Sequence, residues 1–129
     1  MMKSLKSFCL ALFVVTLLAS CGKEHKAKNM VEDFLDTHLV DNSRSGTRFT
    51  RLDSTRMITP ETVMALRKHM RTVTLFKSDV TYSSDDVPST LYYIRVSYDK
   101  KESDGKVERY SQTFYFDKEI KHIIAFKES

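Results

Sequence analysis

The 129-residue chain carries 21 Lys and Arg against 17 Asp and Glu, with two cysteines, three glycines and two prolines. This composition is typical of a globular protein, and three isolated glycines, at positions 22, 46 and 105, exclude a glycine-rich phosphate-binding loop. The formal net charge of +4 includes Lys3 and Lys6, which belong to the N-terminal segment considered next, and without them it is +2. A charge this small gives no evidence for nucleic acid as a partner.

The N-terminal segment has the three parts of a bacterial export signal. Lys3 and Lys6 precede an apolar run from Phe8 to Leu18 that only Thr16 interrupts, and small residues follow. The run is about 11 residues long, whereas a helix needs roughly 20 to cross the hydrocarbon core of a bilayer. Residues 1–20 are therefore predicted to be a cleaved signal peptide and not a transmembrane anchor.

The residues at the predicted cleavage point are Leu18, Ala19, Ser20 and Cys21. They resemble the lipobox of bacterial lipoproteins. The resemblance implies diacylglyceryl transfer to the Cys21 sulfur, cleavage before it and acylation of the new amine, with palmitate among the chains. Two or three acyl chains anchor a protein stably, where a single chain binds a membrane only marginally. The alternative is an ordinary secretory signal that happens to end at a cysteine.

The residues after Cys21 bear on the destination of the chain. Gly22 stands where an aspartate would resemble an inner-membrane retention signal, so we expect transport to the outer membrane. Lys23 and Glu24 weakly resemble the lysine-plus-acid signals that direct some lipoproteins to the cell surface, while His25 departs from that pattern. A periplasmic orientation and a surface orientation both remain open.

The cysteine count limits the chemistry of the mature chain. Cys9 lies in the apolar run and leaves with it, and lipidation of Cys21 uses the other sulfur. No disulfide and no free thiol would then remain, so the 109 residues from Cys21 onward depend on a hydrophobic core. We expect a lipidated tether over residues 21–26 and a single domain over residues 27–129.

Two helices are predicted in the first half of this domain. Apolar residues recur at helical spacing between Glu24 and Val40, with charged residues on the opposite side. Thr59 is suited to cap a second helix, and Pro60 to occupy its first turn. That helix is expected to run from Pro60 to Arg71, with basic residues near its C-terminal end.

The second half alternates with a period of two and predicts four strands, over residues 75–82, 91–98, 107–117 and 120–127. A short strand over residues 48–52 has weaker support, since Phe49 and Leu52 do not share a face. Two helices followed by hairpin-connected strands indicate an α+β domain, with both helices on one face of a curled four-stranded antiparallel sheet.

Five short segments carry a resemblance to known proteins, namely residues 31–35, 52–55, 91–96, 112–118 and 124–127. They resemble segments of uncharacterised lipoproteins of Gram-negative bacteria with a cystatin-like or NTF2-like α+β fold. The resemblance implies this fold over nearly the whole mature chain and carries no catalytic motif with it.

NTF2-like enzymes place an Asp or His with tyrosines in a cavity between helix and sheet, and this suggests a small pocket enzyme or ligand carrier as one alternative. The residues considered for such a pocket are His38, His122, Tyr92, Tyr98 and Tyr110. No acid is clearly placed among them, and inward aromatic residues usually belong to a core. A cystatin-like inhibitor is a further alternative, although Gly22 lies too close to the lipid to reach a protease cleft.

The histidines have no metal-ligand spacing, so we assign no metal site, no cofactor and no catalytic residue. The hypothesis carried forward is recognition through the open face of the sheet, and the alternative is a solvated face that bears scattered charges. Tyr93, Arg95, Arg109 and Tyr115 are the candidate partner-facing residues, with Lys121 and Lys127 beside them. The sequence thus predicts a non-catalytic binding or accessory module, attached to the membrane through Cys21 and meeting an envelope protein.

Overall fold

The computed structural model describes residues 22–129 of the chain. The predicted signal peptide, the lipobox residues Leu18, Ala19 and Ser20, and the predicted lipidation site Cys21 lie outside the described residues. The described residues form two helices and an antiparallel sheet of five strands, so the predicted α+β class is confirmed.

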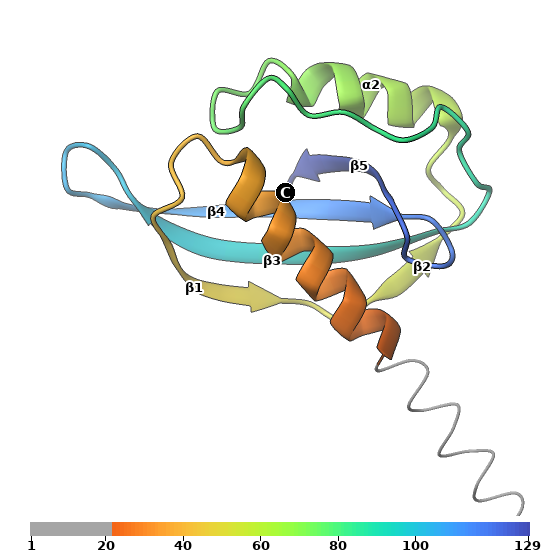
Figure 1. The fold of residues 1–129 in the computed structure, drawn as a ribbon, viewed down its shortest axis with the longest axis horizontal. Helices are drawn as coiled ribbons and strands as arrows, with labels where there is room; N and C mark the ends of the chain where they lie inside the picture. The colour runs from red at the N-terminus through yellow and green to blue at the C-terminus, as the bar shows by residue number, and fades with distance from the viewer. Residues whose placement is uncertain (1–21) are drawn as a thin grey trace, which may run out of the picture.

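The described part of the chain begins with a helix over residues 22–38, called here the N-terminal helix. The elements that follow are β1 (Arg44–Phe49), β2 (Asp53–Thr55), α2 (Pro60–Met70), β3 (Leu91–Lys101), β4 (Val107–Phe116) and β5 (Ile123–Glu128). The strand order is β1-β3-β4-β5, and β2 also pairs with β3, further along the edge that β1 occupies. Figure 1 shows the N-terminal helix crossing this sheet.

The N-terminal helix packs on the first face of the sheet through one apolar stripe. Ala27, Val31, Phe34 and Leu35 recur at helical spacing and are buried. The Phe34 ring meets the rings of Phe114 and Phe126 edge-on, with centroids 5.2 and 4.9 Å away. Edge-on pairs at these distances are favourable beyond their buried area. This aromatic cluster fixes the position of the helix on the sheet.

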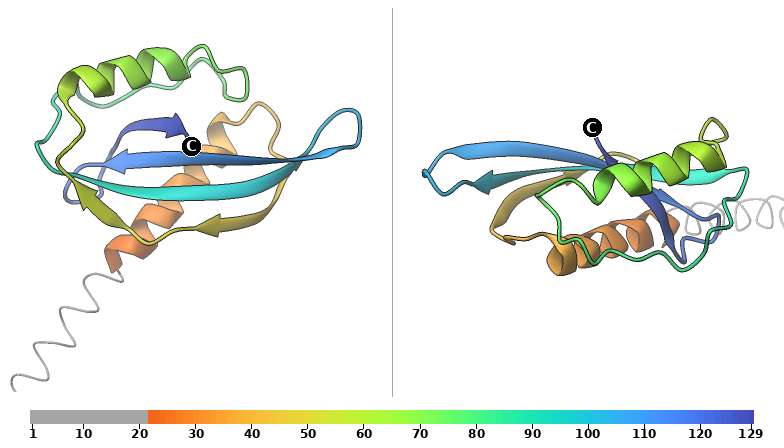
Figure 2. Two further views of the ribbon diagram at one scale, coloured as in Figure 1. Left: turned by 180° about the vertical axis from the view of Figure 1, so that it is seen from behind. Right: turned by 90° about the horizontal axis from the view of Figure 1, so that it is seen from above.

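Helix α2 packs against the other face of the sheet, so the prediction that both helices share one face is wrong. Val63 of α2 belongs to a core cluster with Tyr115 and Ala125. The neighbouring residues Phe114 and Phe126 belong to the cluster under the N-terminal helix. Because side chains alternate along a strand, the two clusters lie on opposite faces. Figure 2 shows α2 running beside β5, away from the N-terminal helix.

Residues 75–82 do not form the predicted strand. Their only ladder contact is an isolated bridge between Leu39 and Phe76. The segment instead binds the end of the N-terminal helix, where the Lys77 N–H donates to the His38 carbonyl over 2.7 Å. That carbonyl has no partner within its own helix. Phe76 and Val80 are buried, so the apolar pattern reflects burial in a loop.

The strand that pairs with the outer side of β3 comes from earlier in the chain. The predicted short strand at residues 48–52 overlaps only the end of β1, at Arg48 and Phe49, and otherwise covers the connection 50–52 that precedes β2. A register irregularity between Ser45 and Arg48 breaks the pairing of β1, and Gly46 there has a φ of 64°. Glycine adopts this left-handed conformation without steric cost.

The final strand starts three residues later than predicted, at Ile123. A turn of Asp117–His122 joins it to β4, and the Ile120 backbone has a φ of 53°. This conformation is strained for a β-branched residue. Ile120 is fully buried in the core under the N-terminal helix, which explains why the turn holds it there.

The predicted tether is part of the folded domain. Residues 22–26 are helical, and the Glu24 carboxylate accepts a hydrogen bond from the Leu52 N–H over 3.1 Å. The Lys23 ammonium lies 5.2 Å from the centre of the Tyr92 ring, a distance at which cation–π attraction acts. The helical pattern was predicted to begin at Glu24, and the structure extends it to Gly22.

The long segment between α2 and β3 is held by a buried arginine. Arg67 of α2 is 5% exposed, and its Nε donates to the Ile124 carbonyl of β5 over 2.9 Å. Its Nη2 donates to the Ser84 carbonyl over 2.9 Å, and Nη1 lies 3.2 Å from the Asp85 carboxylate. The guanidinium also lies 4.3 Å from the Tyr82 ring centre. Arg67 therefore joins α2, β5 and the loop.

We predict that Arg67→Met lowers the free energy of unfolding by about 3 kcal/mol, because it leaves the buried Ile124 carbonyl and the partly buried Ser84 carbonyl without donors. Lys68→Met is the matched control, since Lys68 is the next residue of α2 and is exposed. It should change stability by less than about 0.5 kcal/mol. Urea denaturation followed by circular dichroism measures both, and equal effects would contradict the role of Arg67.

Candidate interaction face of the sheet

The second face of the sheet is divided into a covered part and an open part. Helix α2 covers Tyr115, which is 4% exposed, and Tyr93 packs against the same cluster. Tyr115 therefore cannot meet a partner, which corrects the prediction for that residue. Arg95 and Arg109 are exposed and lie beyond the cluster under α2. The aromatic part of the predicted surface is thus separated from its basic part.

The open part consists of cations above a floor of small hydroxyl residues. Arg95 of β3 is in register with Thr113 of β4, and Thr113 is in register with Lys127 of β5. Arg95 and Lys127 are therefore two strand spacings apart, about 10 Å. Arg48 of β1 is in register with Ser97 on the same face. We call Arg48, Arg95, Arg109 and Lys127 the cationic face.

The floor beneath these cations is hydrogen-bonded across the strands. The Ser97 and Ser111 hydroxyls lie 2.6 Å apart, as do the hydroxyls of Thr113 and Ser129. Thr50 and Arg95 exchange two bonds, since the Thr50 N–H donates to the Arg95 carbonyl and the Arg95 N–H donates to the Thr50 hydroxyl. These contacts fix the backbone from which the arginine and lysine side chains extend.

The cationic face is poorly neutralised by the protein itself. Within residues 22–129, the ion pairs recorded at 4.0 Å or less involve none of its four members. Asp99 is the nearest acid by register, opposite Arg109. Its carboxylate is directed toward β1, where a Cβ added to Gly46 would lie 3.4 Å from Oδ2. Such a surface is electrostatically suited to carboxylates or phosphates.

The space between the N-terminal helix and the sheet is filled by aromatic side chains. Phe76 and Phe126 have ring centres 5.0 Å apart, and the Phe114 ring stacks on Phe126 at 5.1 Å. Tyr98, considered for a pocket, is fully buried, and burial raises the pKa of its hydroxyl to about 12. The structure does not bring the predicted pocket residues together around a cavity.

The other predicted pocket residues lie in separate places. His38 packs on Phe34 with ring centres 4.5 Å apart, and its Nδ1 is 3.5 Å from the Asp79 carboxylate. Tyr92 lies under Lys23 at the beginning of the N-terminal helix. The Tyr110 hydroxyl donates to the Glu102 carboxylate, and this bond is the main cause that raises its pKa to about 12.

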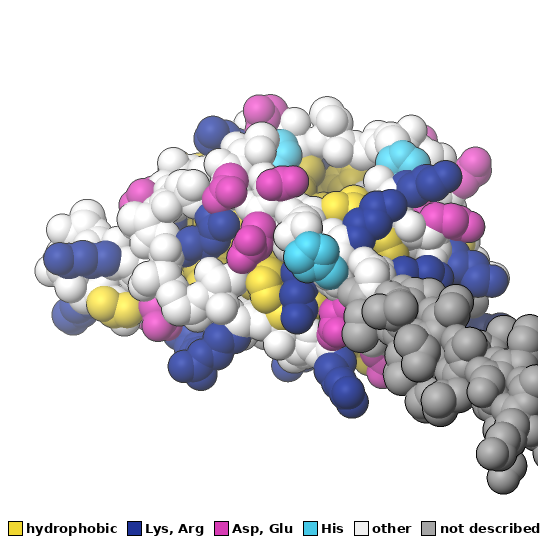
Figure 3. Space-filling view, turned by 60° about the horizontal axis from the view of Figure 1, so that its bottom comes forward, with side chains coloured by type: hydrophobic (Ala, Val, Ile, Leu, Met, Phe, Trp, Pro, Cys, Tyr) yellow, Lys and Arg dark blue, Asp and Glu magenta, His cyan; other side chains and the backbone are white. Residues whose placement is uncertain are grey.

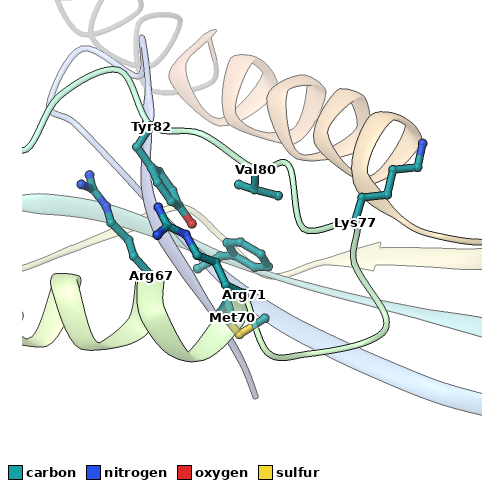
Figure 4. Close-up of a pocket in the computed structure, with 7 residues that line it drawn as sticks. Arg67, Met70, Arg71, Lys77, Val80 and Tyr82 are labelled. Atoms are coloured by element: carbon teal, nitrogen blue, oxygen red, sulfur yellow. The ribbon is translucent and has the colours of Figure 1, made fainter.

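A narrow hollow, with no room for a water molecule, lies between α2 and the long loop. Its walls include the apolar side chains of Met70, Val80 and Phe126. Arg71 and Lys77 also border it, but Lys77 points away from the arginines in Figure 4. Arg67 is already satisfied by protein partners, so this hollow lacks the converging polar groups of a ligand pocket.

His122 is exposed in the turn before β5. It does not share a cavity with His38. Its Nδ1 is 2.9 Å from the Asp117 carboxylate. Burial tends to raise the pKa of Asp117, but the hydrogen bonds from the His122 ring and from the backbone N–H groups of His122 and Lys121 hold it below its usual range. Lys121 belongs to this turn and not to the cationic face.

Three features of the site escaped the sequence analysis. Arg48 was not predicted to share the face of Arg95, because the pairing of β1 with β3 was not anticipated. Arg67 was expected only as one of the basic residues near the C-terminal end of its helix, although it falls four residues after Val63 and three before Met70, on the buried stripe. Lys100 is also buried, and it donates to the Asp41 carbonyl over 2.7 Å.

No group of three or more potential metal ligands converges among residues 22–129, and no helix in that range is long and apolar enough to cross a membrane. Comparisons of the chain with protein-family models, with curated proteins and with solved structures found no match.

We predict that Asp117→Asn lowers the free energy of unfolding by about 1–2 kcal/mol at pH 7, because the ionised carboxylate is a stronger acceptor for the turn. The pKa of Asp117 is depressed on folding, so its contribution is present above the unfolded value of about 3.9 and disappears as the pH falls through the folded value. Urea denaturation between pH 7 and pH 3 should show the two proteins converging at low pH. Asp104→Asn in the β3–β4 loop serves as an exposed control, and a pH-independent difference for Asp117→Asn would contradict the linkage.

Proposed function

We propose that the mature chain is a lipid-anchored protein of the bacterial cell envelope, most simply of the outer membrane, and that it acts as a non-catalytic binding module. Its binding surface is the cationic face, and its partner is an envelope protein that presents carboxylates or phosphates. The proposed surface rests on one observation. Four cations share the open part of the sheet, and none of them has an ion-pair partner among the described residues.

The rigidity of the face supports binding in preference to simple solvation. Its members extend from paired strands whose hydroxyl groups are bonded to one another, so little backbone entropy is lost when a partner docks. Arginine also binds carboxylates and phosphates in a bidentate manner, and three of the four cations are arginines. A merely solvated surface does not require this arrangement.

The filled interior of the domain supports a role without catalysis. The aromatic cluster fills the space where an NTF2-like pocket would lie, and the candidate histidines are far apart in the fold. The cystatin-like inhibitor hypothesis gains no support either, because the residues from Gly22 onward are helical and docked on the domain. An extended N-terminal segment would be needed to enter a protease cleft.

The anchor is tested at the cysteine. Cys21→Ala should abolish incorporation of labelled palmitate, because it removes the sulfur that forms the thioether. Cys9→Ala is the matched control and should retain the label, since Cys9 would be removed with the signal peptide. Mass spectrometry of the purified N-terminal peptide checks the result independently. Palmitate in the Cys21→Ala variant would contradict the proposed anchor.

The binding face is tested by charge reversal. Arg95→Glu with Lys127→Glu should reduce crosslinking to the partner in intact envelopes by about tenfold or more, because two attractive charges become repulsive. Lys68→Glu with Lys106→Glu changes the net charge equally, at exposed sites away from the face, and should leave the crosslinks unchanged. Circular dichroism confirms folding of both variants. Equal loss in both would show a response to net charge alone and would refute the face.

A further inference from the structure

The end of the domain that follows Cys21 has its own surface, distinct from the cationic face. The Lys26 ammonium lies 3.5 Å from the Glu119 carbonyl, so the β4–β5 turn is beside the first turns of the N-terminal helix. The bond between Glu24 and Leu52 places the β1–β2 connection there as well. Figure 1 shows both connections at the end of the molecule where the described chain begins.

This end is rich in cations. Its exposed basic residues are Lys26, Arg51, Lys118 and Lys121, and Lys23 is partly exposed. Figure 3 shows lysine and arginine side chains, interspersed with acidic ones, around the beginning of the described chain.

The acids at the same end are mostly occupied by the fold. The Glu24 carboxylate binds the Leu52 N–H, the Asp53 carboxylate binds the Ser54 N–H, and Asp117 accepts from the turn. The exposed Glu119 is the remaining acid. Arg51, Lys118 and Lys121 are exposed. The Lys23 and Lys26 ammonium groups lie beside the Tyr92 ring and the Glu119 carbonyl and are not paired with an acid in the recorded ion pairs of the described residues.

The covalent chain leaves no spacer at this end. Cys21 directly precedes Gly22, and the helix that includes Gly22 is docked on the sheet from Lys23 and Glu24 onward. Lipid attached at Cys21 would therefore begin within one residue of the folded domain. A flexible linker of ten residues would instead allow a separation of roughly 16–19 Å.

We propose that this end, comprising Lys23, Lys26, Arg51, Lys118 and Lys121, is a membrane-docking surface that lies on the anionic lipid headgroups of the anchoring bilayer. The inference rests on the proposed lipidation of Cys21. Each Lys or Arg near an anionic bilayer adds electrostatic attraction, and the lipid holds the surface within the short range at which that attraction acts.

The consequence is a fixed orientation of the domain. The β3–β4 hairpin projects from the opposite end of the molecule (Figure 1), and β3 alone contains 11 residues. At about 3.3 Å per residue, this strand spans about 36 Å. The hairpin is therefore held well away from the headgroups.

The test uses the full, lipidated chain in nanodiscs of phosphatidylcholine with or without phosphatidylglycerol. Glu119→Cys places a fluorophore site at the docking surface, and Ser103→Cys places one in the β3–β4 loop, where the residue is exposed. The introduced cysteine is then the only free thiol of the processed chain. A quencher attached to the lipid headgroups reports proximity to the bilayer, and mass spectrometry first confirms the lipid on Cys21.

The label at position 119 should be quenched at least about threefold more than the label at 103, and more strongly with phosphatidylglycerol present. Lys118→Glu with Lys121→Glu should reduce that difference, whereas Lys101→Glu with Lys106→Glu, in the hairpin, should not. Ten Gly and Ser residues inserted between Gly22 and Lys23 should also reduce it.

Equal quenching at the two sites in a lipidated protein would overturn the docking surface while leaving the anchor intact. Quenching that follows the protein-to-lipid ratio and ignores lipid charge would assign the surface to a second copy of the chain and would also overturn the inference. A chain without lipid on Cys21 would instead refute the proposed function, and the mass measurement separates that result from the others.

Discussion

The packing of Phe34 against the sheet is the constraint on which the rest of the fold depends. Its ring touches residues from three parts of the chain: Phe76 in the long loop, Phe114 in β4 and Phe126 in β5. Loss of this ring would leave a cavity where the helix, the sheet and the loop meet, at a cost of about 3–5 kcal/mol. Because the N-terminal helix and its aromatic contacts fill the first face, the proposed binding surface is on the second face.

On the second face, a structural contact defines the extent of the proposed binding surface. Arg67 fixes α2 to β5 through the Ile124 carbonyl, and α2 then covers Tyr115 while it leaves Arg95 open. The boundary between covered and open parts is thus set by the length and position of one helix. The cations beyond that boundary are those that the proposed partner would meet.

Much of the fold followed from local patterns. The cap Thr59 and Pro60 located the start of α2, and the alternation in β3 and β4 was correct because both strands are long and half of each is buried. The errors arose where tertiary contacts override local pattern. The apolar spacing of Phe76 and Val80 is compatible with a strand, but their backbone is engaged by the N-terminal helix and not by the sheet. Arg95 and Arg109 were correctly expected to be on an open surface, whereas the burial of Tyr115 depends on where α2 crosses, which no local pattern specifies.

The register irregularity in β1 disfavours edge-to-edge association between neighbouring domains. β1 is an edge strand, and an edge with regular, unpaired backbone groups is a template for association with another chain. The irregularity at Gly46, together with Arg44 and Arg48, interrupts that template, while Arg67 occupies a carbonyl on the opposite edge strand, β5. Proteins confined to two dimensions meet one another far more often than they do in free solution. Because both sheet edges are interrupted, such domains can lie close together on a surface without pairing strand to strand.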